Sequence, residues 1–209
     1  MPIRMSADLS KKRQSDPRTA GRGPWQTPAT KVLQMKPDRV LLLTTGGTID
    51  KIYFDSLSEY QVGPPGIERL LQRVRFVPQW RVCSLIRKDS LDLTESDRQL
   101  IRETVQTAPE SRVLITHGTD TMAQTAQSLL GIPDRIIVLT GAMQPAGFHD
   151  SDADFNVAFA LGALQSLTTP GVWIAMNGQL LAAGKAHKNR ELGIFELLPH
   201  NTNAPQTET

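Results

Sequence analysis

The stretch "RVLLLTTGGTID", residues 39–50, contains the first strongly apolar run of the chain and ends it with two glycines between threonines. A short run of Val and Leu that stops at Gly-Gly predicts a buried strand and a turn that other groups can approach closely. Two kinds of site use such a turn: a phosphate-binding loop, or a nucleophile beside backbone that side chains do not cover. The rest of the sequence distinguishes between them.

From Arg39 onward, short apolar runs alternate with longer amphipathic ones, which is typical of βαβ units around a parallel sheet. The short runs are rich in Val, Ile and Leu, as expected of strands that are covered on both faces. The sequence therefore predicts a single α/β domain with a Rossmann-like, open, mostly parallel sheet and helices on both faces. The strands are predicted at residues 39–44, 80–86, 112–117, 135–141 and 171–176.

Helices are predicted between these strands from both periodicity and end signals. One begins at Thr94 with Asp97 three residues later, a variant of the capping box, and another ends at Gly131 before Pro133. The helices are expected at residues 66–74, 94–106, 120–131 and 151–167. In the last of these, the residues expected to face the core are Phe155, Ala158, Phe159 and Leu161.

Loops that follow the strands of such a sheet lie at one edge, because right-handed crossovers return the chain to the same side each time. Four predicted loops at that edge are rich in hydroxyls, carboxylates and glycine. The sequence therefore predicts that side chains from four separate segments gather there. The segments are "TTGGTID" (44–50), "RKDSLDLT" (87–94), "HGTDT" (117–121) and "TGAMQPAG" (140–147).

The Gly-Gly turn does not fit a nucleotide site. It matches neither G-x-G-x-x-G nor the P-loop, and residues 50–63 show no helical face whose N-terminus would hold a phosphate. A nucleophile fits better, because glycines admit a substrate and leave N–H groups to stabilise an oxyanion while a neighbouring hydroxyl attacks. Since a threonine hydroxyl needs a proton acceptor, Tyr60 and the pair Thr119 and Asp120 are candidates.

Other roles stay open for several of these residues. Thr119 and Asp120 are also favoured N-cap types for the helix predicted at 120–131. Lys185 follows the last predicted strand, where its ammonium would neutralise Asp120 or transfer a proton, or else lie at the surface. The sequence predicts no metal site, because no metal-ligand spacing is found among His117, His149, His187 and His200.

Composition limits the remaining possibilities. The 209 residues, 39% of them hydrophobic, suit one core plus tails. Residues 1–38 hold eight Lys or Arg and three Asp, which is typical of a disordered basic tail, with nucleic-acid contact as the alternative. Residues 39–196 form the predicted domain and 197–209 a polar tail. The single cysteine, Cys83, and the lack of long apolar runs predict a cytoplasmic protein without membrane association.

Several quoted segments occur in the order and at intervals similar to those of a known family. They are "TTGGTID", "YQVG", "DSLDLT", "ITHGTDTM", "LTGAMQP", "SDADFN" and "GKAH". Over residues 39 to about 196 the chain resembles the bacterial-type L-asparaginases, and "TGGTI" with "HGTDT", each after a strand, is the specific pair. The resemblance implies a cofactor-independent amidohydrolase that converts asparagine, in some members glutamine, to the acid and ammonia through a threonine nucleophile and an acyl-enzyme.

The resemblance also implies residue roles. Thr48 is the expected nucleophile and Tyr60 its partner on a closing loop. Thr119, Asp120 and Lys185 form the expected second constellation, in which Lys185 buried against Asp120 tunes a threonine or activates water. Asp120 is also expected to receive the α-ammonium of the substrate, Ser90 its carboxylate, and Ala142 to lie near the scissile amide. The substrate-binding residues are then Gly47, Asp89, Ser90, Gly118 and Ala142.

One departure from the family is large. Longer members carry a smaller C-terminal domain that donates an acidic group to the neighbouring subunit's site, and this sequence ends where that domain would start. We therefore expect a short single-domain form with an altered substrate clamp, weaker asparagine binding and a homo-oligomeric state, dimer or tetramer. Two alternatives remain: an amidohydrolase acting on glutamine or another amide, and a non-catalytic module that binds Asp or Asn.

Overall fold

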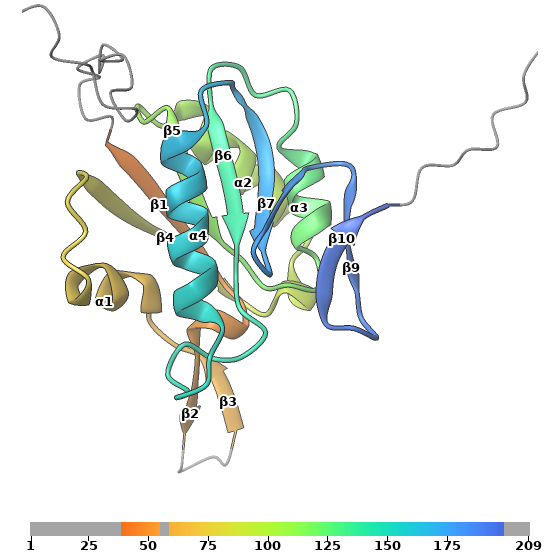
Figure 1. Ribbon diagram of the computed structural model, residues 1–209. Helices are drawn as coiled ribbons and strands as arrows, with labels where there is room; N and C mark the ends of the chain where they lie inside the picture. The colour runs from red at the N-terminus through yellow and green to blue at the C-terminus, as the bar shows by residue number, and fades with distance from the viewer. Residues whose placement is uncertain (1–38, 55–58, 199–209) are drawn as a thin grey trace, which may run out of the picture. The chain divides into compact units, whose positions relative to one another are not determined.

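A six-stranded sheet forms the centre of the fold in the computed structural model, which describes residues 39–54 and 59–198 (Figure 1). The sheet order is β4-β1-β5-β6-β7-β8; the first five strands run parallel and β8 pairs antiparallel with β7. The predicted α/β class and mostly parallel sheet are confirmed. The strands are β1 (Val40–Gly46), β4 (Trp80–Lys88), β5 (Arg112–Thr116), β6 (Ile136–Thr140), β7 (Gly171–Met176) and β8 (Gln179–Ala182).

Two hydrophobic cores lie on the two faces of this sheet. Side chains alternate along β1, so that Leu41 and Leu43 enter one core while Val40 and Leu42 enter the other. Helices α2 (Glu95–Thr107) and α3 (Met122–Ser128) cover the first face, and α1 (Gly66–Arg73) and α4 (Ala153–Ser166) cover the second (Figure 1). This explains why the strands read as continuous apolar runs.

The helix signals are confirmed in α2 and corrected in α4. Thr94 and Asp97 form a reciprocal capping box at the start of α2. In α4, Phe155 and Ala158 are exposed, whereas Asn156 is buried. Asn156 takes the inward position because its side-chain amide is fully hydrogen-bonded. Its Nδ2 donates to Gly141 O and to the carboxylate of Asp152, and its Oδ1 accepts the N–H of Asn177, just after β7.

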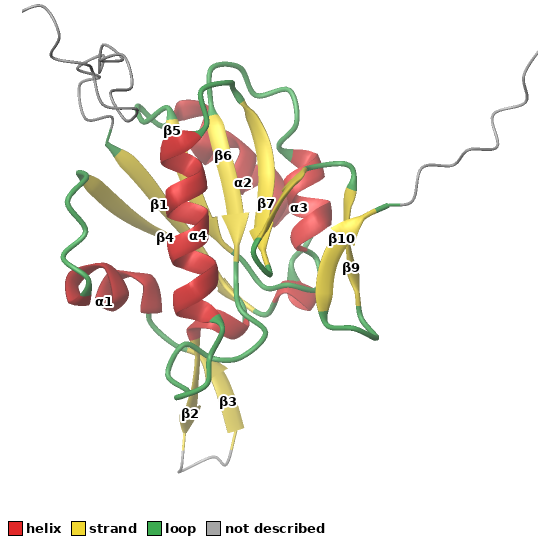
Figure 2. Cartoon of the chain, in the orientation of Figure 1, coloured by secondary structure: helices red, strands yellow, loops and turns green. Residues whose placement is uncertain are grey.

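Two antiparallel hairpins outside the central sheet, which the sequence did not predict, are seen in the structure (Figure 2). The first, β2 (Lys51–Phe54) with β3 (Glu59–Val62), follows the short 3₁₀ helix η1 (Thr48–Asp50). The second, β9 (Ala186–Asn189) with β10 (Ile194–Leu197), follows β8. The basic tail predicted at 1–38 lies outside the described residues, as does most of the polar tail predicted at 197–209.

The chain order places a topological switch point around β1. From β1 the chain passes through α1 to β4 on one side, and from β4 through α2 to β5 on the other. The loops after β1, β4 and β5 therefore leave the same edge of three adjacent strands, which is where open α/β sheets bind ligands.

Candidate active site

The turn after β1 requires its two glycines. Gly46 and Gly47 have φ values of 88° and 85°, in the left-handed region that side chains disfavour. A Cβ on Gly46 would lie 2.6 Å from Lys88 O of β4, and Gly47 N–H donates to the same oxygen at 2.9 Å. The two threonines before them, Thr44 and Thr45, are buried in β1. Thr48, half-buried, then begins η1.

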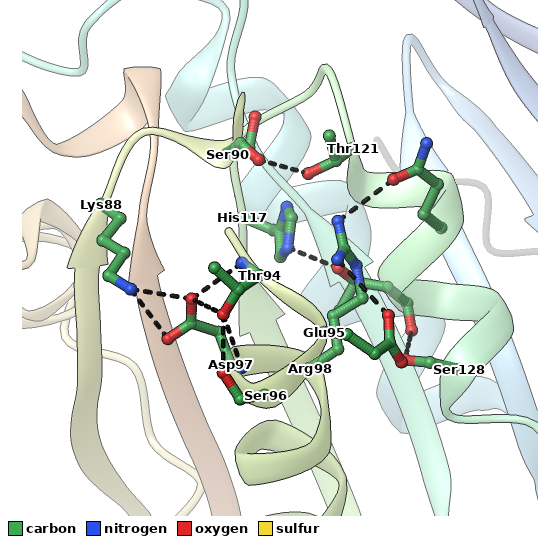
Figure 3. Close-up of polar contacts among 12 residues, drawn as sticks. Lys88, Ser90, Thr94, Glu95, Ser96, Asp97, Arg98, His117, Thr121 and Ser128 are labelled. Carbon is green, nitrogen blue, oxygen red and sulfur yellow. Dashed lines mark hydrogen bonds and ion pairs between the residues drawn. The ribbon is translucent and has the colours of Figure 1, made fainter. Parts of the chain in front are cut away.

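Loops after three adjacent strands touch at this turn, as the topology predicted. A Cβ on Gly47 would lie 2.4 Å from Cα of Gly118, and a Cβ on Gly118 would lie 2.5 Å from Oγ of Ser90. Thr121 Oγ1 donates to Ser90 O at 2.7 Å and ties the second loop to the third (Figure 3). The Ser90 hydroxyl itself is buried and has no hydrogen-bond partner among the described residues. It is therefore a polar group whose bonding capacity a ligand can satisfy.

The second predicted constellation is present, but with a different lysine. Lys188 Nζ donates to Thr119 Oγ1 at 2.8 Å and to Asp120 Oδ1 at 3.0 Å. Lys185, the predicted partner, is exposed in the turn before β9, where its N–H donates to Ala182 O. The assignment of Lys185 to Asp120 is therefore wrong, and Lys188 occupies that place.

The strand register explains why Lys188 reaches the site. In the β9–β10 ladder Lys188 lies directly opposite Phe195, and residues opposite each other share a face. Phe195 is completely buried in the core beneath α3, so its face of the hairpin is turned toward the sheet. The hairpin is fixed there because Asn177 Oδ1 accepts the N–H of Phe195 at 3.0 Å. The sequence signal is that Lys188 lies two residues after the buried Ala186 and so on the same face of β9, but the register depends on the packing of Phe195.

Capping does not explain Thr119 and Asp120. Helix α3 begins at Met122 with Thr121 at its N-cap and without a side-chain capping bond. Thr119 is buried and its hydroxyl accepts from the lysine. Asp120 is half-buried, and its Oδ1 also lies 3.8 Å from the exposed guanidinium of Arg190, a residue that belongs to none of the sequence motifs.

His117, the first residue after β5, is a buried neutral group. Its Nδ1 donates to Gly118 O at 2.7 Å, and its Nε2 therefore accepts from Thr125 Oγ1 at 2.9 Å. Burial lowers the pKa of His117 to about 4, with the positive charge of Arg98 acting in the same direction. The imidazole thus holds the peptide of Gly118 in place and carries no charge near neutral pH.

Asp89 shapes the loop after β4. Its Oδ1 accepts the N–H of Leu91 at the start of the 3₁₀ helix η2 (Ser90–Asp92), and Lys51 Nζ lies 2.7 Å from Oδ2. Burial alone would raise the pKa of Asp89, but the Lys51 ammonium and the loop N–H groups outweigh it and lower the pKa. Contact of Asp89 with a substrate stays a prediction.

The loop after β6 is held by a carboxylate. Ala142 is buried, and Asp152 accepts the N–H groups of Met143 and Gln144 at 3.0 and 3.1 Å. Tyr60 lies on β3 opposite Tyr53; its side chain is outside the described part of the structure.

Neither a metal cluster nor a membrane helix is found in the described segments. Within residues 39–54 and 59–198, no group of three or more His, Cys, Asp or Glu is arranged to hold a metal ion. None of the helices there combines the length and the apolar character needed to cross a bilayer.

Comparison with known proteins gives a family match. The family model "Asparaginase, N-terminal" matches residues 39–196. The chain is 30% identical over 165 residues to the probable periplasmic L-asparaginase of Haemophilus influenzae and 31% identical over 158 residues to L-asparaginase 2 of Escherichia coli. These alignments cover 74% and 68% of this chain but 47% and 44% of the relatives.

The solved structures give the same result. L-asparaginase I from Vibrio cholerae superimposes with a TM-score of 0.66 at 26% identity, covering 78% of this chain and 52% of that one. The chain thus spans about half the length of the relatives it matches. Because the family model covers the whole described fold, with Thr48, Ser90, Thr119 and Asp120 gathered at one sheet edge, the chain belongs to the asparaginase family and corresponds to its N-terminal domain.

Proposed function

We propose that this chain hydrolyses the side-chain amide of L-asparagine to L-aspartate and ammonia, with Thr48 as the nucleophile. The observation that carries the proposal is the pairing of Lys188 with Thr119 and Asp120 in a loop whose Gly118 touches Gly47. A hydroxyl nucleophile needs a proton acceptor and an electrostatic partner close by, and this contact supplies both types of group. Family membership supports the same reaction.

The first half of the reaction uses the turn after β1. The hydroxyl oxygen of Thr48 attacks the amide carbon. The hydroxyl proton passes through neighbouring side chains to the leaving nitrogen, and ammonia departs, which leaves the acyl group as an ester on Thr48. Gly47 N–H is already bound to Lys88 O, so it is not the oxyanion donor. The N–H groups of Thr48 and Thr119 are not engaged by other described residues, and we assign the developing negative charge to them.

The second half uses the loop after β5. Lys188 donates to Thr119 Oγ1, which leaves the hydroxyl proton of Thr119 available for the leaving group or a water molecule. Asp120 balances the lysine charge. A water then cleaves the ester, the products being aspartate and free Thr48, so that atoms and protons balance over the cycle. Tyr60 keeps its proposed role as partner of Thr48.

Substrate binding is assigned to groups that still have bonding capacity. The buried hydroxyl of Ser90 suits the α-carboxylate, and Asp120 suits the α-ammonium. Arg190 lies close to Asp120 and competes for it, which supports weaker binding of free asparagine. Gly47, Gly118 and Ala142 would form the walls near the scissile amide.

The test measures ammonia release from L-asparagine by the wild type and Thr48→Ala. We expect the variant to lose at least about a hundredfold in kcat, because the attacking atom is gone. Thr169→Ala, at an exposed loop position, makes the same chemical change and should match the wild type. Unchanged turnover by Thr48→Ala would refute Thr48 as the nucleophile.

A substrate panel separates the alternatives. Higher kcat/KM on L-glutamine or on a peptide-linked asparagine would assign another amide. Calorimetric binding of L-aspartate without ammonia release from any amide would indicate the non-catalytic binding module. The dimeric or tetrameric state is likewise a proposal, and sedimentation of the full chain measures it. Cytoplasmic location stays a prediction, since the Haemophilus influenzae relative carries a periplasmic name.

A further inference from the structure

Asp50 is a buried acidic residue that the reaction scheme does not use. It ends η1, two residues after Thr48, and is only 4% exposed. It takes part in none of the ion pairs found among the described residues. Because a buried carboxylate without a paired cation is costly, its hydrogen bonds should reveal what it does.

Asp50 makes three hydrogen bonds, one within its own turn and two to other parts of the fold. Its Oδ1 accepts the N–H of Gly66 at 2.8 Å, its carbonyl accepts the N–H of Gly63 at 2.7 Å, and its own N–H donates to Gly47 O at 3.2 Å. Gly63 directly follows β3, and Gly66 is the first residue of α1. Asp50 therefore fastens the turn that carries Thr48 to the base of the β2–β3 hairpin and to α1.

The bond to α1 favours the charged form of the carboxyl group. Pro65, at the N-cap of α1, makes no side-chain capping bond, so the carboxylate of Asp50 serves this helix end from sixteen residues earlier. The first N–H groups of a helix carry partial positive charge, and an ionised carboxylate accepts a stronger hydrogen bond than a neutral one. The strength of the hydrogen bond from Gly66 to Asp50 therefore depends on whether the Asp50 carboxyl group is ionised.

Asp50 changes charge in an accessible pH range. Burial raises the pKa of Asp50 to about 6, although the N–H of Gly66 and the charge of Arg87 on β4 act to lower it. Of the other nearby cations, Lys51 and Arg73 are each paired with a different aspartate, and Arg69 of α1 lines the cavity that Gly66 also lines. From the loop after β6, the apolar residue Ala146 donates its N–H to Ile49 O, next to Asp50, at 3.1 Å.

We infer that the ionised Asp50 carboxylate is a positioning residue for Thr48, and that loss of its charge lowers turnover by loosening the turn. The inference rests on the proposed function. It also explains why an unpaired carboxylate is kept in the core: the fold holds a costly group because the charge orients the nucleophile.

The first experiment compares the pH dependence of kcat for ammonia release by the wild type and Asp50→Asn between pH 5 and 8. The asparagine side chain keeps an acceptor oxygen but no charge. We expect wild-type kcat to fall at least threefold from pH 8 to pH 5, and Asp50→Asn to be at least fivefold slower at pH 8 without that acid limb. KM should change less than twofold. Asp134→Asn, at an exposed position where Asn tolerates the positive φ of 54°, is the matched control.

A second readout separates positioning from a purely structural role. At pH 8 the midpoint of thermal unfolding should be higher in Asp50→Asn than in the wild type, because the variant no longer buries a charge, while its activity is lower. A structural role predicts that stability and activity fall together. An acid limb in Asp50→Asn identical to that of the wild type would overturn the inference.

The positioning role of Asp50 can also be tested if the proposed amidohydrolase activity is absent. If the wild type releases ammonia from no amide, calorimetry with L-aspartate at pH 5.5 and 8 replaces turnover. A pH-dependent affinity in the wild type that Asp50→Asn lacks would support positioning of the Thr48 turn. The same pH dependence in both proteins would overturn it.

Discussion

The site is assembled from two regions that differ in how they are built. The loops after β1, β4 and β5 leave adjacent parallel strands and contribute Thr48, Ser90, Thr119 and Asp120. The β9–β10 hairpin is a separate two-stranded ladder and contributes Lys188. The first region is positioned by topology, because all parallel strands end at one edge. The second is positioned by its register against the core, where Phe195 is the buried contact.

This difference shows where a motif can mislead. In the parallel region, a residue that follows a strand lies at the carboxyl-end edge of the sheet whatever its sequence neighbours are. In a hairpin, a shift of one residue turns every side chain to the opposite face, so nearby lysines are not equivalent. Lys185 and Lys188 are three positions apart, and only Lys188 contacts Thr119.

The largest expected effect tests the two lysines directly. Lys188→Met should lower kcat for ammonia release by about a hundredfold or more, because it removes the ammonium from Thr119 and Asp120. Lys185→Met, the matched control, should stay within about twofold of the wild type. A greater loss in Lys185→Met than in Lys188→Met would reverse the assignment and with it the register argument.

The next prediction concerns the contact inside the parallel region. Gly47→Ala places a Cβ 2.4 Å from Gly118 at a φ of 85°, so it should cost about 2–4 kcal/mol of unfolding free energy and at least about tenfold in activity. Gly131→Ala has a similar φ of 79° with no atom within 4 Å, and should cost about 1 kcal/mol. Denaturant unfolding of both variants measures the difference. Equal costs would show that the backbones at Gly47 and Gly118 do not constrain each other.

Stability should respond to pH in opposite directions in the two loops of the parallel region. The pKa of His117 is lowered from 6.5 to about 4, so the unfolded chain binds more protons between those values and stability rises with pH there. The pKa of Asp50 is raised from 3.8 to about 6, so the folded chain binds more protons and stability falls as pH rises. Each contribution is about 3 kcal/mol, and in the wild type they largely cancel.

Variants should reveal the two contributions. Between pH 4 and 6.5 the unfolding free energy should rise with pH in Asp50→Asn, where the opposing contribution of Asp50 is gone, and fall with pH in His117→Gln. Denaturant titrations at several pH values measure both slopes. Slopes of the same sign in the two variants would contradict the opposed pKa shifts.

The smallest effect is expected at the rim of the hairpin region. Arg190 is exposed and lies 3.8 Å from Asp120, so Arg190→Gln should lower KM for L-asparagine about twofold by freeing the carboxylate for the α-ammonium. The difference should shrink in added salt, because exposed charges are screened. A higher KM in the variant would show that Arg190 assists binding.

Much of the parallel region was predictable from sequence. All five predicted strands form, and the four helices begin and end within a few residues of their signals. The error in α4 had a physical cause: Phe155 is outside and Asn156 inside, because buried hydrogen bonds outweighed side-chain hydrophobicity at that position. Neither hairpin was predicted, since strands of four residues give little periodic signal.

The sequence by itself determined the α/β architecture and the gathering of Thr48, Ser90, Thr119 and Asp120, because buried parallel strands read as apolar runs and their following loops share one edge. Only the tertiary structure decided which lysine completes the constellation and that Asp50 fastens the Thr48 turn to α1. Both depend on contacts between residues far apart in the chain, whose register and burial are set by packing and leave no local pattern.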